Sequence, residues 1–577
     1  MAEFQNAIDA LKHHVEHRGD SLAYQTIDSF GKVIDTVDYQ ALWYRSHSIA
    51  QTITTFTQPG DRVILLYENS IEMISALLGC MISHTIAIPC APLKGSLSPT
   101  AISIVRLMGI ANNANPSLIL SNEQYTQRLL TYSKSNTPIV NNTHQPIKII
   151  NTEAITTTTH TASIRLNSIA YLQYTSGTTG VPKGVILSHD NVSNNVHHLI
   201  HHANTSERER LQTAVNWLPL HHDMGLINAV FIPLYLGCPS ILLSPFSFLK
   251  RPVTWLTTIS QYPGVTSGAP CFAFAHCCKY ITEDQRKNLD LSSWALAFVG
   301  SDSSKIEQIT AFIDRFQDYQ LDPTIFHPCY GLAEATVHVC GDWRLQGLES
   351  HAFDRGALQA GVAKLSTINY KTLIAHGKPF NDHGLYIVDR DTQEQLPEKC
   401  LGEIWIKGPS VASGYWNNKS ISKETFNNKL EGHEGIFLKT GDIGFMMNNQ
   451  LYITGRLKDT LIIRGQNIAP DDIEWIVMRN TAQLQYGQVA AFSIEENHEE
   501  QLIVLIHQPR YPIEEREILL ESAYTAILNQ LGIQPKKICL IKAPALPLTT
   551  SGKLNRIACK KLYLEHQYTI LSSFKRY

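Results

Sequence analysis

Residues 174–184 read YTSGTTGVPKG, and this stretch decides how the rest of the chain is interpreted. Hydroxyl and glycine residues alternate through it and lead to a single lysine, Lys183. Such a loop presents backbone N–H groups and threonine hydroxyls to a phosphate chain, while the lysine adds a point charge. The pattern is not a P-loop, because Pro182 precedes the lysine and Gly184 follows it. Apolar runs flank it on both sides, so we expect a strand, a phosphate-binding loop and a second strand.

The composition excludes several classes of protein. Lys and Arg number 48 and Asp and Glu 51, which gives a formal charge of −3 and no reason to expect a nucleic-acid partner. The eleven cysteines form no CxxC pair, which favours a reducing, cytoplasmic setting over a disulfide framework. The most apolar stretch, residues 63–89, is interrupted by charged and polar side chains, so we expect no stable membrane insertion. The apolar stripe Phe4, Ile8, Leu11 and Val15 predicts an N-terminal helix rather than a signal peptide.

Chain length and alternating patterns predict an α/β protein of more than one domain. At 577 residues the chain exceeds a single core. Strand-like runs alternate with helical patterns between residues 60 and 340, which favours layers built on largely parallel sheets. After about residue 455 the pattern changes to a small α+β unit, in which Pro470 and three acids suit the first turn of a helix. We place the boundary at Lys458, between residues 1–457 and residues 458–577.

Four further segments carry residue types suited to nucleotide chemistry. Glu334 in YGLAEAT can hold Mg²⁺ against phosphate oxygens, although a helix-start acid has the same appearance. Asp442 in KTGDIG can accept hydrogen bonds from both hydroxyls of a ribose, although an ordinary Asx-turn would show the same sequence pattern. Arg456 follows in TGRLKD, and Lys553 lies in PLTTSGKLNR. Each residue is unremarkable alone.

Together these segments resemble the adenylate-forming superfamily of acyl-CoA synthetases, luciferase, peptide-synthetase adenylation domains and fatty acyl-AMP ligases. The motifs stand in the family's order and span nearly the whole chain, with NWLPLHHDMGL at residues 216–226 matching the gating segment. The resemblance implies a large adenylation domain of layered sheets and helices, followed by a small mobile α+β domain. It also implies that ATP and a carboxylic acid react to give an acyl-AMP and pyrophosphate.

The resemblance assigns roles residue by residue. It implies that Lys183, Glu334 and Lys553 are catalytic, that Glu334 and Thr178 hold Mg²⁺, that Lys458 is the hinge, and that His222 belongs to the substrate gate. The ATP contacts that it implies are Thr175, Ser176, Gly177, Thr178, Thr179, Gly180, Ser301, Tyr330, Gly331, Asp442 and Arg456. One segment departs from the family, because Gly300-Ser301-Asp302-Ser303 stands where a Gly-Ala-Glu-Pro-like stretch is usual beside adenine.

Spacing between the motifs resembles the fatty acyl-AMP ligase branch. More than forty residues separate Glu334 from the HGKP turn at residues 376–379, and the excess at residues 345–373 looks like the insertion of that branch. Residues 243–256 and 267–277 also resemble it. The resemblance implies a medium- or long-chain fatty acid substrate. It also implies that the insertion restrains the mobile domain, so that the acyl group passes to the phosphopantetheine thiol of an acyl carrier protein.

Other functions and sites stay open at this point. The alternatives are an acyl-CoA synthetase, an amino-acid activator and a nucleotide- and lipid-binding homologue without turnover. HHDMG is not the HHxxxDG of condensation enzymes, because Asp223 follows the two histidines directly. In VHHLIHHA the pairs His197/His201 and His198/His202 have zinc-ligand spacing, but the sequence places no acidic or cysteine partner nearby, which favours a solvated helix face. Three aromatic residues suit either an acyl tunnel or the core: Trp255, Phe272 and Phe274.

Overall fold

The chain folds into two compact units that interleave along the sequence. The computed structural model describes residues 4–93, 95, 97–98, 101–135, 138–175, 182–202, 211–300, 306–341, 347–463, 466–481, 484, 487–496, 499–548 and 554–575. The first unit comprises Met1–Glu349, Ala375–Leu385 and Trp405–Lys439, and the second Ser350–Ile374, Tyr386–Ile404 and Thr440–Tyr577. The segment that resembles a branch-specific insertion therefore belongs largely to the same unit as the C-terminal residues. The hinge and domain boundary at Lys458 stay predictions.

The first unit contains a six-stranded sheet with the order β6-β5-β3-β4-β7-β8. Every neighbouring pair is parallel except the last, β7 and β8. The central strands are almost wholly buried, as is usual where helices cover both faces of a parallel sheet. The strand bounds are β3 (Arg62–Leu66), β4 (Ile86–Cys90), β5 (Leu118–Ser121), β6 (Lys148–Asn151), β7 (Ile169–Thr175) and β8 (Lys183–Ser188).

A second sheet of the first unit has nine strands in the order β17-β14-β13-β12-β11-β9-β10-β1-β2. The run from β13 to β1 is parallel, and the pairings at both ends are antiparallel. The predicted α/β class with largely parallel sheets is therefore confirmed. The strand bounds are β1 (Leu22–Ile27), β2 (Val33–Asp38), β9 (Thr213–Asn216), β10 (Ser240–Leu243), β11 (Val265–Ala269), β12 (Trp294–Val299), β13 (Phe326–Tyr330), β14 (Cys340–Gly341) and β17 (Lys378–Pro379).

Helix α3 (Ile71–Ile82) joins the two sheets into one core. All twelve of its residues are buried, and it contacts β1 and β2 of one sheet and β3 and β4 of the other. A helix that is buried on every side and largely apolar requires such a position. The hydroxyl of Ser70 caps its first turn by accepting from the Met73 N–H at 3.2 Å. This helix is the middle of the apolar stretch that was expected not to span a membrane, and no helix among the described residues is long and apolar enough to do so.

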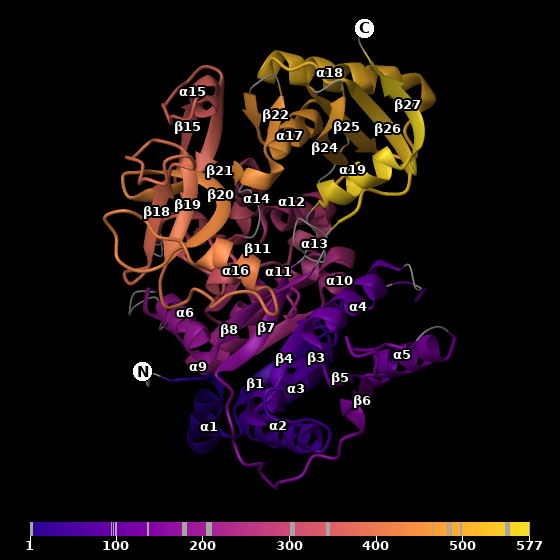
Figure 1. The fold of residues 1–577 in the computed structure, drawn as a ribbon, viewed down its shortest axis with the longest axis vertical. Helices are drawn as coiled ribbons and strands as arrows, with labels where there is room; N and C mark the ends of the chain where they lie inside the picture. Colours follow the sequence, from indigo (N-terminus) through magenta and orange to yellow (C-terminus); the bar gives the residue numbers. More distant parts are fainter. Residues whose placement is uncertain are drawn as a thin grey trace. The chain divides into compact units, whose positions relative to one another are not determined.

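Figure 1 labels the remaining helices of the first unit, several of which contact the two sheets. The N-terminal helix is present as predicted, with Ile8 and Leu11 buried. The bounds are α1 (Ala7–Arg18), α2 (Tyr39–Thr54), α4 (Ile102–Ala114), α5 (Glu123–Ser135), α6 (His189–His202), α8 (Asp223–Leu226), the π-helix η2 (Ile227–Phe231), α9 (Ile232–Leu236), α10 (Pro245–Lys250), α11 (Val253–Gln261), α12 (Cys271–Tyr280), α13 (Glu283–Arg286), α14 (Ile306–Phe316) and α16 (Lys419–Phe426).

The second unit begins with a hairpin and includes strands of a further sheet. Strands β15 (Ser350–Asp354) and β16 (Tyr370–Ile374) pair in antiparallel register, with the short helix α15 (Arg355–Gln359) between them. A four-stranded sheet has the order β18-β19-β20-β21. Its strand bounds are β18 (Gly384–Val388), β19 (Gly402–Lys407), β20 (Leu438–Met447) and β21 (Gln450–Arg456).

The C-terminal part of the second unit is a small α+β fold, as predicted. Helix α17 (Pro470–Asn480) starts at the expected proline. Strand β25 alternates, so that Val504 packs with α17 and α18 on one face of the sheet while Leu505 packs toward α19 on the other. The other bounds are η6 (Leu457–Asp459), β22 (Leu461–Ile463), β23 (Gln466–Ile468), β24 (Val489–Glu496), β25 (Glu499–His507), α18 (Arg516–Leu531), β26 (Lys537–Ala543), α19 (Arg556–Leu564) and β27 (Thr569–Phe574).

Candidate active site

The predicted phosphate loop joins two paired strands. β7 and β8 are antiparallel, and Thr175 lies opposite Lys183 at the point where the pairing ends. The expected strand–loop–strand arrangement is therefore confirmed. Gly184 allows the ring of Tyr174 to lie across β8, because a Cβ there would come within 2.8 Å of that ring. The Tyr174 hydroxyl in turn donates to Asn113 Oδ1 at 2.5 Å. The loop residues Ser176, Gly177, Thr178, Thr179 and Gly180 lie outside the described residues.

Lys183 and Glu334 are connected through Tyr415, which the sequence analysis did not identify. The Lys183 ammonium lies 5.0 Å from the centre of the Tyr415 ring. The hydroxyl of the same ring donates a hydrogen bond of 2.7 Å to Glu334 Oε1. Strand β8 holds this aromatic residue in place, because Val185 forms a β-bridge with Tyr415. Two predicted residues that are far apart in sequence thus share one aromatic side chain.

The turn after β13 fixes the backbone of Glu334. The Ala412 N–H donates to the Glu334 carbonyl at 2.9 Å, and Thr336 Oγ1 donates to the Ser410 carbonyl at 2.8 Å. Thr336 has φ +71, a strained value for a β-branched residue. The turn is also tight at Gly331, where a Cβ would lie 1.5 Å from the Val337 carbonyl oxygen. Only glycine fits at this position, so the contact fixes the start of the turn that presents the carboxylate.

The carboxyl ends of parallel strands bring several predicted residues to one edge of the nine-stranded sheet. Tyr330 ends β13 and is buried, and Gly331 follows it directly. Gly300 follows β12, the parallel neighbour of β13. A Cβ at Gly300 would lie 2.9 Å from Cys329 Sγ. This edge is the usual ligand site of open parallel sheets. Ser301, the next residue after Gly300, lies outside the described residues.

The predicted gate follows another strand of the same edge. Segment 217–222 leaves the carboxyl end of β9, and His222 stands directly before α8. Its Nδ1 lies 2.5 Å from Oδ1 of the buried Asp223. Gln173 of β7 donates to the His221 carbonyl at 2.7 Å, which ties the gate to the strand that carries the phosphate loop. The π-helix η2 follows α8, and π-turns are frequent at functional sites.

A buried histidine lies near the same segment. Burial lowers the pKa of His338 to about 4, and the nearby Asp223 carboxylate opposes the shift only in part. The imidazole is therefore neutral at pH 7. Asn195 of α6 donates to the His338 carbonyl at 2.7 Å, which fixes the backbone beyond the Glu334 turn.

In the second unit, the predicted ribose residues are neighbours. Asp442 and Arg456 face each other across β20 and β21, and Arg456 Nε donates to Asp442 Oδ1 at 2.7 Å. The carboxylate is buried, whereas the arginine side chain is 52% exposed. Thr440 Oγ1 accepts from the Asp442 N–H at 3.1 Å and so orients the turn. Lys458, the predicted hinge, is exposed in the 3₁₀ turn η6 directly after β21.

Lys553 itself lies outside the described residues, but both flanks of its loop are anchored in the second unit. Leu548 and Leu554 form a β-bridge. Arg556, three residues after the lysine, donates from Nε and from a terminal nitrogen to the two oxygens of Glu474 at 2.8 Å each. It also pairs with Asp471 and lies 3.7 Å from Asp459 of η6. One arginine therefore ties the lysine loop to α17 and to the hinge turn.

The insertion-like segment packs on β20 and β21 and contacts α17. Phe353 of β15 lies edge-on to Phe445 at 5.1 Å and to Tyr452 at 5.4 Å. Lys371 of β16 pairs with Asp472 of α17 at 2.8 Å, and both side chains are about a quarter exposed or less. These contacts connect strands before Lys458 with a helix after it.

The three aromatic residues considered for an acyl tunnel divide into two groups. Trp255 and Phe274 are wholly buried and pack on each other at 5.9 Å, as core residues do. Phe272 is only partly buried and lies edge-on at 6.1 Å to Trp217, the residue that follows β9. A role in acyl binding stays a prediction, and Phe272 is the better candidate.

Comparison with known proteins agrees with this arrangement. The family model described as AMP-binding enzyme matches residues 11–416, well over half of the chain. The chain belongs to the AMP-binding enzyme family. Its membership explains why the ordered motifs occur together: such enzymes are ligases that use ATP to form an adenylate.

Similar proteins place this AMP-binding enzyme in the fatty acyl-AMP ligase branch. It is 34% identical to the medium-chain-fatty-acid–[acyl-carrier-protein] ligase JamA of Moorena producens, over 98% of this chain and 96% of that protein. It is 32% identical to the long-chain-fatty-acid–AMP ligase FadD26 of Mycobacterium marinum, over 96% of each chain. The crystal structure of the fatty acyl-adenylate ligase of L. pneumophila with acyl adenylate and pyrophosphate is similar too (TM-score 0.74, 30% identity, 99% and 98% covered).

Proposed function

We propose that this enzyme activates a medium- or long-chain fatty acid with Mg-ATP and passes the acyl group to the phosphopantetheine thiol of an acyl carrier protein. The observation that carries the first half is the group formed by Lys183, Tyr415 and Glu334 beside the phosphate hairpin. The names of the relatives JamA and FadD26 support the acid class. Eleven free cysteines and the use of ATP support a cytoplasmic location.

The first half-reaction needs alignment and charge neutralisation rather than a base. The fatty acid carboxylate is ionised at neutral pH and attacks the α-phosphorus of ATP, and pyrophosphate leaves. Both reactants are anions, so cationic side chains lower the barrier by stabilising charge in the transition state. Lys183 serves the departing β,γ-phosphates, and Lys553 serves the α-phosphate and the substrate carboxylate.

Glu334 fits a Mg²⁺ site. Magnesium prefers one or two carboxylates completed by water and phosphate oxygens, and a single acid in a tight turn supplies that set. Tyr415 holds one carboxylate oxygen, which fixes the orientation of the other. With Thr178 as the second protein ligand, the ion would neutralise charge on the polyphosphate.

Asp442 and Arg456 suit recognition of the ribose. A carboxylate accepts hydrogen bonds from two vicinal hydroxyls, and the contact with Arg456 holds this buried carboxylate in place. The arginine side chain is 52% exposed, so a ligand can reach it. Tyr330 and Gly331, at the sheet edge, are proposed to contact the adenine.

The choice of acceptor rests on the insertion. Lys371 spans from β16 to α17 and also donates to the Thr454 carbonyl at 3.4 Å, two residues before Arg456. We infer that this contact restrains rotation about Lys458. A partly buried ion pair is worth about 1 kcal/mol, so it biases the mobile domain without locking it. Such a bias disfavours the conformation in which the acyl group is transferred to coenzyme A. Transfer to the thiol of a carrier protein can still occur, because docking of the carrier protein supplies binding energy that offsets the bias.

One experiment tests both halves. The enzyme is incubated with C6–C18 fatty acids, Mg-ATP and either coenzyme A or holo acyl carrier protein, and the products are read by mass spectrometry. We expect acyl-AMP with fatty acids but not with amino acids, and acyl transfer to the carrier protein in excess over acyl-CoA. Acyl-CoA as the main product would instead identify an acyl-CoA synthetase. Absence of acid-dependent ATP–pyrophosphate exchange would identify a binding protein without turnover.

A further inference from the structure

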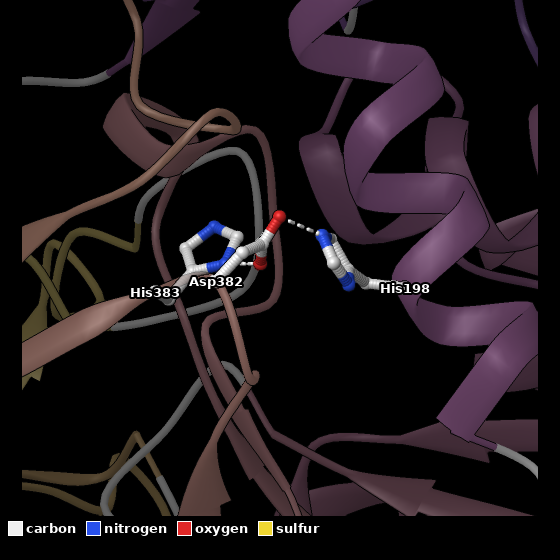
Figure 2. A group of neighbouring side chains, drawn as sticks. All are labelled: His198, Asp382 and His383. Carbon is white, nitrogen blue, oxygen red and sulfur yellow. Dashed lines mark hydrogen bonds and ion pairs between the residues drawn. The ribbon is translucent and has the colours of Figure 1, made fainter.

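Three side chains with metal-ligating atoms meet in the first unit, and none of them is among the residues assigned to adenylation. His198 lies on α6, and Asp382 and His383 lie in the turn between β17 and β18 (Figure 2). His198 Nε2 lies 2.6 Å from one oxygen of Asp382, and His383 Nδ1 lies 2.8 Å from the other. One carboxylate therefore lies between two imidazoles that come from segments 184 residues apart.

The cluster is built on a rigid support. The turn closes with a hydrogen bond of 2.8 Å from the His383 N–H to the Phe380 carbonyl. The Phe380 ring stacks on His198, with ring centroids 5.5 Å apart and planes 16° apart. The His383 side chain is wholly buried, and Gly408 makes room for it, because a Cβ at Gly408 would lie 2.4 Å from the imidazole. Both imidazoles thus have fixed orientations before any ligand arrives.

We propose that His198, Asp382 and His383 bind one divalent transition-metal ion, with Zn²⁺ as the best match. Two imidazole nitrogens and one carboxylate oxygen form a donor set that Zn²⁺ prefers, and water supplies the fourth position. The three ligand atoms lie within 4.8 Å of one another. Two nitrogen donors also select against Mg²⁺ and Ca²⁺, which favour oxygen ligands. The site is therefore chemically distinct from the magnesium position proposed at Glu334.

Metal binding needs only small changes. A carboxylate accepts hydrogen bonds, so each imidazole now carries its proton on the nitrogen that faces Asp382. On binding, each ring nitrogen that faces Asp382 gives up its proton and directs its lone pair to the ion. At Zn–N and Zn–O distances of about 2.0–2.1 Å, tetrahedral ligand atoms lie roughly 3.3 Å apart. The imidazoles must therefore adjust where ligand atoms are up to 4.8 Å apart, and the carboxylate must shift so that its contacts of 2.6 and 2.8 Å lengthen. Asp382 is 43% exposed, which leaves it free to do so.

The structure also explains which histidines of VHHLIHHA take part. His197 is engaged elsewhere, since its Nε2 lies 2.9 Å from the Phe4 carbonyl and its ring packs edge-on to Tyr235. His198 lies one residue further round the helix and faces the turn at Asp382. The acidic partner that the local sequence lacked is thus supplied by a distant segment. Because α6 begins directly after β8, the ion would fasten the helix that continues the Lys183 strand.

The test uses full-length protein without a histidine tag, freed of metal by chelation. Calorimetric titration with Zn²⁺ is expected to show one ion bound per chain, together with a higher melting temperature. His198→Ala and Asp382→Asn should each weaken binding by at least roughly 10–100-fold, the loss seen even for outer-shell changes. His201→Ala, on the same helix, is the matched control and should bind as the unaltered protein does. ATP–pyrophosphate exchange reports that each variant is folded.

A spectroscopic readout separates this site from the cysteines. Co²⁺ bound in place of Zn²⁺ should give visible ligand-field bands without a thiolate charge-transfer band, and His198→Ala should remove them. The proposal is overturned by thiolate ligation, by equal losses in His201→Ala and His198→Ala, or by the absence of stoichiometric uptake. Asp382→Asn keeps the shape of the side chain, so it gives a decisive result even if His198→Ala does not fold.

Discussion

Tyr415 donates a hydrogen bond of 2.7 Å to Glu334, and the face of the same ring lies 5.0 Å from the Lys183 ammonium. One side chain thereby orients the proposed magnesium ligand and the proposed phosphate lysine together. Tyr415 is 7% exposed, so both interactions operate in a largely desolvated place, where they are stronger than at the surface. The two halves of the phosphate site are therefore coupled through this ring.

Replacing Tyr415 separates the two interactions. Tyr415→Phe removes a hydrogen bond to a charged group, worth about 1.5–3 kcal/mol, and should lower ATP–pyrophosphate exchange roughly tenfold or more. Tyr415→Leu also removes the ring and should cost more, because the cation–π contact is lost. Tyr280→Phe, at a half-exposed surface position, serves as the control. Exchange at the unaltered rate in both Tyr415 variants would show that the ring does not organise the site.

The lysine in the C-terminal loop should be essential for adenylation. Lys553→Ala is expected to lower exchange by roughly two orders of magnitude or more, as for other groups that stabilise transition-state charge. Lys561→Ala removes a lysine that is 73% exposed from the neighbouring helix α19 and should leave the rate unchanged. Equal rates in the two variants would remove Lys553 from the mechanism.

The ion pair between the insertion and α17 can be reversed. Lys371→Asp and Asp472→Lys each break the pair and place like charges together, so each should raise the fraction of acyl-CoA formed several-fold. The double variant restores an ion pair of opposite sense and should return the product ratio toward that of the unaltered enzyme. Product ratios are measured with coenzyme A and carrier protein in competition. Additive effects of the two changes, without restoration, would argue that the pair does not restrain the domain.

The turn before Glu334 should not tolerate a single added methyl group. In Gly331→Ala the new Cβ meets the Val337 carbonyl oxygen at 1.5 Å, so the backbone must move at a cost of at least about 3 kcal/mol. We expect a lower urea midpoint and loss of exchange. Gly109→Ala in α4 is the control, because its Cβ meets only Pro182 at 3.4 Å and alanine favours a helix. Similar midpoints for the two variants would contradict the steric argument.

Acid should destabilise the fold in part through His338. Its pKa falls from 6.5 to about 4 on burial, so between these pH values the unfolded chain binds a proton that the folded chain does not. The contribution of His338 to the free energy of unfolding is therefore fully present above pH 6.5. It declines as the pH falls through this interval, by up to about 1.36 kcal/mol per pH unit. His338→Gln should flatten the profile of unfolding free energy over this interval. Other buried histidines remain in both proteins and cancel in the comparison, so parallel profiles would exclude His338 as a source.

The sequence predicted the elements whose signal is local. The apolar strands, the start of α17 at Pro470 and the hairpin around the phosphate loop follow from periodicity and from proline and glycine positions. These features depend on neighbours in the chain, which a sequence displays directly.

Contacts between residues far apart in the chain could not be predicted from the sequence, because they depend on how distant segments pack together. Tyr415 lies 81 residues from Glu334, and the aromatic residues of its segment SGYW are as common in cores as in sites. The acidic partner of His198 could not be predicted for the same reason, since the contact depends on how α6 packs against the turn at Asp382. In the sequence Arg556 looks like an ordinary residue at the start of a helix. Its ion pairs with α17 become apparent only in the structure.

The aromatic contact of the insertion has a consequence for synthesis of the chain. His351 lies opposite Tyr452, a residue made 101 residues later, and Phe353 packs on the same ring. At about 5–20 residues per second on the ribosome, the hairpin β15–β16 is complete roughly 3–16 s before the strands that cover it. During that interval Phe353 faces solvent or a chaperone. A ribosome pause between residues 374 and 438 would prolong this exposure, so the nascent chain should be most vulnerable to aggregation there.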